Sequence, residues 1–293
     1  MTAESIVVGV DEAPPSLRAA ALAWTIGEAT GATCHLVHAV PDAVAISEFE
    51  RASAVGPGLA ERLEREAGKR LTARLRGVVP PAVARALEVR RGRAAAVLAE
   101  RAAHHHATLV VLGRKRHGAL ERALGGSTAH YLVRALDIPI LLGTRSSIKR
   151  VLAAIDVSPA AAPTLHEARR LANGLGAELR VLHVVSPTRY PRVVPRAPDR
   201  KLLERQAAQA FDRFAQELGV AEAERTVRRG SPEIEIAAEA ATWRADVVVV
   251  GSQGKGFVDR LLIGSTTEWL LDRLATVSLL VVPVGRRAGA LRV

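Results

Sequence analysis

The sequence predicts an α/β protein made of two tandem, doubly wound parallel-sheet domains with five strands each. Three observations support this prediction: apolar runs bounded by glycine, their alternation with helical stretches, and the occurrence of the whole pattern twice. A valine run such as residues 247–250 is typical of a strand buried on both faces of a parallel sheet. Strands alternating with helices predict a sheet that helices cover on both sides. A chain of 293 residues is long enough for two such domains.

The second half of the chain repeats the first. Residues 109–127 read LVVLGRKRHGALERALGGS and match residues 247–265, which read VVVVGSQGKGFVDRLLIGS. Residues 6–11 likewise match residues 151–156. Because the period is so long, it indicates duplicated domains rather than a solenoid. The polar stretch at 144–147 marks the boundary, which gives domains 1–145 and 146–293.

Each half is expected to contain five strands separated by helices. The strands are predicted at residues 5–10, 33–40, 86–90, 108–112 and 138–142, with counterparts at 149–155, 178–185, 225–229, 246–250 and 277–283. Helices fill the gaps, for example at 16–30 and 163–175. Residues 44–58 and 186–199 fit no element well. Each of these segments is either a functional lid or a plain solvent loop.

The best candidate binding site follows the fourth strand of the second half. Gly251 and Gly254 allow the backbone to approach an anion without a side chain in the way. Gly264 and Ser265 then begin a helical stretch, whose free amides and dipole favour a negative charge. Lys255 can add a charge-assisted contact. The pattern predicts a phosphate-binding cradle.

Other residues are expected to reach the same place. In an open α/β sheet, ligands lie beyond the carboxyl ends of the strands, where the winding reverses. Asp156 ends the first strand of the second half and can accept hydrogen bonds from a ribose or an adenine amino group. Val184 or Val185 is expected to line the base, and Thr266 lies in the first turn of the helix. The alternative role for Asp156 is the N-terminal cap of the following helix.

With these motifs, the chain resembles tandem universal stress proteins over nearly its whole length. That resemblance implies a Rossmann-like sheet of strand order 3-2-1-4-5, of the adenine nucleotide α-hydrolase type. The nucleotide-binding branch of the family carries Gly-x2-Gly-x9-Gly-(Ser/Thr) for ATP phosphates and an aspartate after the first strand. The second half has every part of this signature. The resemblance implies ATP as the ligand, with Mg²⁺, and a regulatory or sensing role in a stress response.

The first half departs from the signature at one position. Its matching residues, which are weaker candidates, are Asp11, Gly113, Gly126 and Ser127. Arg116, however, stands where the second glycine is expected. If this position needs a positive φ, a non-glycine residue costs about 1–3 kcal/mol. Three interpretations stay open: a solvated basic loop, weakened binding, or a cationic lip of residues 114–117 that grips phosphate.

Several other classes of function are not supported. There is no P-loop motif, and no Gly-x-Gly-x2-Gly follows the first strand. Residues 104–106 are three consecutive histidines, but neighbours on a helix point apart, so we expect no metal site there. The net charge of +11 could attract nucleic acid, yet only 3% of residues are aromatic and no DNA-reading motif is present. We therefore do not expect a nucleic-acid partner.

No nucleophile with a partnered base stands out, so the chain is expected to hydrolyse ATP slowly at most. The alternatives to a nucleotide-binding regulator are a weak ATPase and a scaffold without a nucleotide. The single cysteine, Cys34, suits a reducing cytoplasm, and no apolar run has membrane-spanning length. The two halves are expected to pair through residues 138–142 and 277–283, which would cover exposed strand edges. A homodimer is an open alternative.

Overall fold

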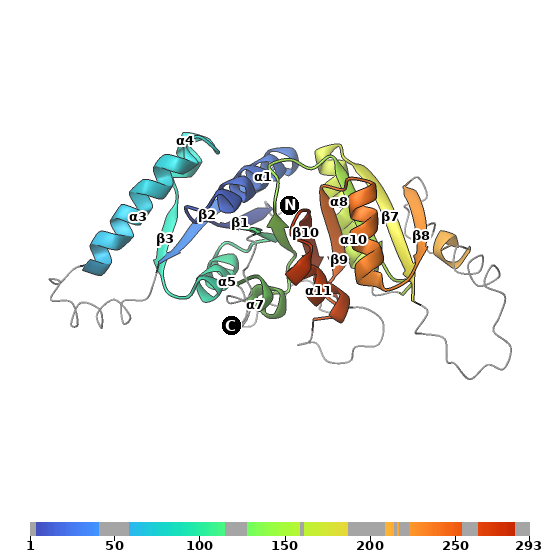
Figure 1. Cartoon of the computed structure of the whole chain (residues 1–293). Helices are drawn as coiled ribbons and strands as arrows, with labels where there is room; N and C mark the ends of the chain where they lie inside the picture. Colours follow the sequence, from blue (N-terminus) through green and yellow to red (C-terminus); the bar gives the residue numbers. More distant parts are fainter. Residues whose placement is uncertain are drawn as a thin grey trace. The chain divides into compact units, whose positions relative to one another are not determined.

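A computed structural model gives the fold of most of the chain. The structure describes residues 4–40, 59–114, 128–158, 161–186, 209–213, 216, 223–253 and 263–284. These residues form two compact units, one within residues 1–147 and the other within residues 148–286 (Figure 1). Each unit is described by itself below.

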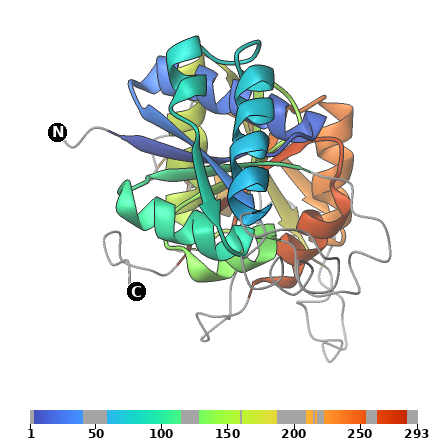
Figure 2. The ribbon, with the colours of Figure 1, turned by 90° about the vertical axis from the view of Figure 1, so that its left-hand side faces the viewer.

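Unit 1 alternates strands and helices along the chain, as the sequence predicts. Its elements are β1 (Ser5–Gly9), α1 (Pro14–Thr30), β2 (Thr33–Val40), α3 (Leu59–Leu75), α4 (Pro81–Arg85), β3 (Glu88–Arg91), α5 (Ala94–His104), β4 (Leu109–Gly113), α7 (Thr128–Ala135) and β5 (Ile140–Gly143). The strands are parallel and lie in the order β3-β2-β1-β4-β5. Helices α1, α3 and α4 pack on one face, and α5 and α7 on the other (Figures 1 and 2). Figure 2 views this unit from the side of α3.

Unit 2 repeats this architecture. Its elements are β6 (Arg150–Ile155), α8 (Ala162–Leu175), β7 (Glu178–Val185), β8 (Glu224–Arg229), α10 (Pro232–Thr242), β9 (Val247–Gly251), α11 (Ser265–Arg273) and β10 (Ser278–Val282). All paired strands are again parallel, and read from β8 their order is β8-β7-β6-β9-β10. Both units thus have the order 3-2-1-4-5, which confirms the predicted fold class.

The central strands of both units are buried on both faces. Val7 and Val8 of β1 and Val248 and Val249 of β9 are fully buried. These continuous apolar runs are the reason that the strands could be predicted from sequence. Within the residues that the structure describes, no helix has both the length and the apolar character that a membrane crossing requires.

The first helix of each unit ends in the same way. Gly31 after α1 and Gly176 after α8 both adopt the left-handed conformation, with φ of 76° and 60°. A side chain at either position would strain the backbone, so glycine is the residue that ends these helices cleanly. The chain then turns directly into the second strand, β2 or β7.

Candidate functional site

The candidate site of unit 2 lies at the carboxyl ends of two neighbouring parallel strands. Strands β6 and β9 pair with Leu152 opposite Val248. Asp156 directly follows β6, and Gly251 is the last residue of β9. On one side of this pair the sheet continues through β7 and β8, and on the other through β10. The winding therefore reverses between β6 and β9, which is where open α/β sheets bind ligands.

The start of helix α11 is fixed beside the end of β9. The amide of Gly264 donates to the carbonyl oxygen of Ser252 at 2.9 Å, and the amide of Glu268 donates to the carbonyl oxygen of Gly264 at 2.9 Å. The latter is the first bond of the helix, so the amides of residues 265–267 have no acceptor within the helix. Ser265 is exposed and Thr266 is half-buried. The first turn of α11 therefore presents backbone donors and two hydroxyl groups.

Gly264 itself has φ of −64° and ψ of 142°, an extended conformation open to any residue. The backbone angles at this position therefore do not require glycine. Gly264 is buried, and it is the N-cap of α11.

Two threonines that the sequence reasoning missed surround Gly251. The Thr267 hydroxyl donates to the carbonyl oxygen of Gly251 at 2.7 Å and ties α11 to β9. A Cβ on Gly251 would lie 2.7 Å from Val284 Cγ2 and 3.1 Å from Thr164 Oγ1. Thr164 is 2% exposed, and its hydroxyl has no hydrogen-bond partner in the described structure. A buried polar atom without a partner is uncommon in a folded protein and therefore calls for an explanation.

Asp156 does not cap the helix that follows it. The N-cap of α8 is Ala161, and no side chain bonds that end. The Asp156 carboxylate instead accepts a hydrogen bond from the Ser158 hydroxyl at 2.5 Å. Asp156 is half-buried, whereas Ser158 is buried. The capping alternative for Asp156 is therefore wrong, and Ser158 orients the carboxylate at the end of β6.

A histidine in each unit fixes the end of the first strand. His183 Nδ1 lies 3.0 Å from the carbonyl oxygen of Ile155, and His38 Nδ1 lies 2.8 Å from that of Val10. Because a carbonyl oxygen can only accept, Nδ1 carries the proton in both rings. These histidines hold the backbone directly before each aspartate. The sequence shows them at matching positions, and that match was the available signal.

Val184 is the neighbour of His183 on β7. It is half-buried and lies one residue beyond the pairing of His183 with Ile155. This position places it near the carboxyl end of the sheet, next to the strand that carries Asp156. An apolar side chain here could pack against a base.

The corresponding place in unit 1 is built differently. The Asp11 amide donates to Ser16 Oγ at 2.7 Å, and Asp11 Oδ1 accepts from the Ala13 amide at 3.0 Å. The carboxylate thus closes the turn that leads into α1. A Cβ on Gly113 would lie 2.5 Å from the Ser16 backbone nitrogen. In unit 1 the glycine that ends β4 is therefore required for the close contact between this strand and α1.

Arg114, one of the four residues of the expected cationic lip in unit 1, is buried. Arg114 is only 8% exposed, and its amide donates to the carbonyl oxygen of Gly143. It therefore does not belong to an exposed basic loop. The remaining signature residues lie outside the described residues: Arg116, Gly126, Ser127, Gly254 and Lys255. Residues 44–58 and 187–199, which include most of the two unassigned segments, also lie outside them.

Comparison with known proteins matches both halves of the chain to the same family. The model of the universal stress protein family matches residues 2–142 and again residues 147–283. A universal stress protein of Mycolicibacterium smegmatis (strain ATCC 700084 / mc(2)155) is 29% identical over 208 residues, which are 67% of this chain and 68% of the relative.

Two solved structures share the fold over the whole chain. A universal stress protein from Archaeoglobus fulgidus DSM 4304 superposes with a TM-score of 0.65 at 15% identity, over 97% of this chain and 99% of the other. One from Pseudomonas aeruginosa UCBPP-PA14 gives a TM-score of 0.63 at 18% identity, over 97% and 94%.

Proposed function

The chain belongs to the universal stress protein family, and we propose that its second unit binds ATP, so that nucleotide occupancy regulates a stress response. One observation carries this proposal. Two hydrogen bonds, from Gly264 to Ser252 and from Thr267 to Gly251, hold the N-terminus of α11 at the carboxyl end of β9. A helix end of the kind that suits an anion therefore lies at the reversal point of the sheet.

The helix end suits a phosphate group for two reasons. The amides of residues 265–267 are donors without an acceptor in the helix, and the helix dipole favours negative charge by about 0.3–1 kcal/mol, or up to ~2 kcal/mol when partly buried. The hydroxyls of Ser265 and Thr266 supply further donors in the same turn. Thr164 Oγ1 is a buried hydroxyl without a partner beside Gly251, as expected of a polar group that serves a ligand.

Asp156 and Val184 suit the nucleoside. A carboxylate repels phosphate but accepts hydrogen bonds from ribose hydroxyls, so Asp156 fits the sugar better than the phosphates. Val184 lies on the adjacent strand and offers an apolar surface for the base. The nucleotide would thus extend from the β6–β7 side, which holds the nucleoside, to the start of α11, which holds the phosphates.

Magnesium would enter with the nucleotide. Mg²⁺ in nucleotide sites is held mainly by the substrate's phosphates and water, with one or two carboxylates. Asp156 is the acidic residue among the described members of this site, and Ser158 already donates to it. The donor set therefore fits a magnesium ion carried by the nucleotide better than a separate protein-held ion.

The test compares two substitutions at Gly264. Because its φ is −64°, the backbone accepts either alanine or glutamate. We expect Gly264→Glu to abolish Mg-ATP binding, since a carboxylate would occupy the phosphate position. Gly264→Ala adds only a methyl group and should weaken binding less.

Binding is measured by calorimetry, with circular dichroism to show that both variants are folded. Unchanged affinity in a folded Gly264→Glu variant would contradict the proposal. Multiple-turnover release of phosphate from ATP would contradict the part of the proposal in which occupancy, and not hydrolysis, is the signal.

A further inference from the structure

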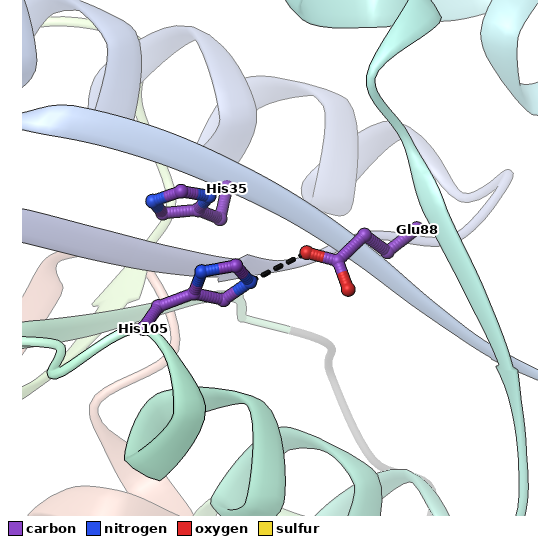
Figure 3. A group of neighbouring side chains, drawn as sticks. All are labelled: His35, Glu88 and His105. Carbon is purple, nitrogen blue, oxygen red and sulfur yellow. Dashed lines mark hydrogen bonds and ion pairs between the residues drawn. The ribbon is translucent and has the colours of Figure 1, made fainter.

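Three side chains with metal-ligating atoms meet in unit 1, whereas the candidate nucleotide site belongs to unit 2. They are His35 on β2, Glu88 on β3 and His105, which directly follows α5 (Figure 3). One ligand atom from each lies within 4.8 Å of the others. His105 Nε2 lies 2.6 Å from Glu88 Oε1, and the two imidazole rings stack with centroids 3.7 Å apart.

The fold explains why these residues meet. Strands β2 and β3 are parallel neighbours with Val37 opposite Glu88, so His35, two residues earlier, shares a face with both. Helix α5 packs against β2 on this face, and the His105 amide donates to the carbonyl oxygen of Arg101 in its last turn. The ring of His105 is thereby brought under that of His35.

The neighbours of His105 do not take part in this cluster's ligand set. His104 and His106 are exposed, whereas His105 is half-buried. The three consecutive histidines therefore do not converge, but the expectation of no metal site at residues 104–106 differs from the proposal made below for His105. What sequence reasoning missed is that the middle histidine joins two residues that are distant in sequence.

We propose that His35, Glu88 and His105 form a binding site for a divalent transition-metal ion such as Zn²⁺. Two imidazoles and one carboxylate are a donor set that zinc accepts, with water in the remaining position. Imidazole nitrogen favours zinc and similar ions over Mg²⁺ and Ca²⁺. Zn–N distances are about 2.0–2.1 Å, so the side chains must rotate inward to close on the ion.

The proton between His105 and Glu88 stands where the ion would bind. An ionised carboxylate only accepts, so His105 Nε2 donates to Glu88 Oε1. A metal ion can replace that proton and use the same two atoms.

Arginines engage the second oxygen of Glu88. Arg101 Nε lies 2.9 Å from Oε2, and Arg90 Nη2 lies 3.1 Å from it. These contacts orient the carboxylate with Oε1 toward His105, and such support of a ligand is usual around metal ions. Arg101, whose side chain is 9% exposed, also brings Nη2 to 3.2 Å from His105 Nε2, so its positive charge opposes a dication at this place. We therefore expect a moderate affinity for the ion.

Unit 2 provides a comparison within the same chain. Aligned with the repeat, His35 corresponds to Arg180, Glu88 to Thr226 and His105 to Trp243. The Arg180 guanidinium lies 4.5 Å from the centre of the Trp243 ring, and Arg180 pairs with Glu239, the counterpart of Arg101. Unit 2 thus keeps a stacked pair and an ion pair at this place, with no histidine in either stacking position. Stacking alone does not require two histidines.

The test is calorimetric titration of the EDTA-treated full-length chain with Zn²⁺, in the absence of nucleotide because ATP itself binds the ion. We expect saturable binding of Zn²⁺, including one site that is weakened when a residue of this cluster is replaced. His35→Gln, Glu88→Gln and His105→Gln should each weaken that site at least about tenfold. Glu88→Gln is nearly isosteric, so it remains informative if a histidine variant folds poorly.

The matched control is the double variant His104→Gln/His106→Asn. It removes the exposed histidines, and asparagine tolerates the positive φ of 49° at position 106. This variant should keep the site. The proposal is overturned if no saturable zinc binding is seen, if folded Glu88→Gln binds like the original chain, or if the control variant loses the site.

Discussion

The hydroxyl of Thr267 links helix α11 to strand β9. It donates to the Gly251 carbonyl oxygen at 2.7 Å, and Thr267 is only 4% exposed. Thr267→Val keeps the shape but removes the donor, so it should lower the free energy of unfolding by about 1–3 kcal/mol. Urea denaturation measures this loss, and Mg-ATP binding should weaken with it. Thr267→Ser keeps the hydroxyl, so it should retain most of the stability and most of the affinity for Mg-ATP. Equal effects of Thr267→Val and Thr267→Ser would contradict this role.

Cys34 is expected to be chemically quiet at neutral pH. Burial raises the pKa of its thiol to about 11, and Sγ lies 3.3 Å from the carbonyl oxygen of Ala23. Alkylation by iodoacetamide should therefore be slow at pH 7 in the folded chain and fast after unfolding in urea. The raised pKa also means that this group's contribution to stability is present below pH 9 and is lost as the pH rises toward 11. Rapid alkylation of the folded protein at pH 7 would contradict this account.

Individual site residues could be predicted only where a motif names them. The motif gave Asp156, Gly251 and Gly264, and the structure places all three at one edge of the sheet. It could not give Thr267 or Thr164, because the sequence does not show which hydroxyl of a helix faces the neighbouring strand. Those two assignments depend on packing between elements.

The strands were predictable because most are continuous apolar runs. Strands β2 and β7 have the predicted bounds, 33–40 and 178–185. Strand β3 begins at Glu88, although residues 86–90 were predicted. The reason is that the Ala86 amide still bonds the carbonyl oxygens of Ala82 and Val83 at the end of α4. The cluster of His35, Glu88 and His105 could not be predicted, since its members come from three elements far apart in the sequence.

The glycines that end β4 and β9 should respond differently to the same substitution. A Cβ on Gly113 would lie 2.5 Å from a backbone nitrogen of α1, which cannot move without shifting the helix. A Cβ on Gly251 would meet the side chain of Val284 at 2.7 Å, and the nearest backbone atom, the carbonyl oxygen of Gln253, would lie 3.1 Å away. Gly113→Ala should therefore destabilise by about 3 kcal/mol or more and Gly251→Ala by about 1–3 kcal/mol. Thermal unfolding measures the loss of stability in each variant, and a larger loss for Gly251→Ala than for Gly113→Ala would contradict this reasoning.

The chain as a whole is a duplicated fold whose halves have diverged. Unit 2 combines the complete sequence signature with the helix end beside β9, whereas in unit 1 Asp11 closes a local turn and Gly113 packs on α1. We therefore propose one nucleotide site per chain, in unit 2, and a metal site in unit 1. Pairing of the two halves through residues 138–142 and 277–283 stays a prediction.

The stoichiometry of Mg-ATP binding tests the central claim most directly. Calorimetric titration of the full chain should give one nucleotide per chain, because the local contacts of Asp11 and Gly113 leave unit 2 as the binding unit. Gly264→Glu should remove that site, and Gly126→Glu, at the matching position of unit 1, should leave it intact. Two nucleotides per chain would contradict the assignment to unit 2 alone, and no binding would contradict the nucleotide function itself.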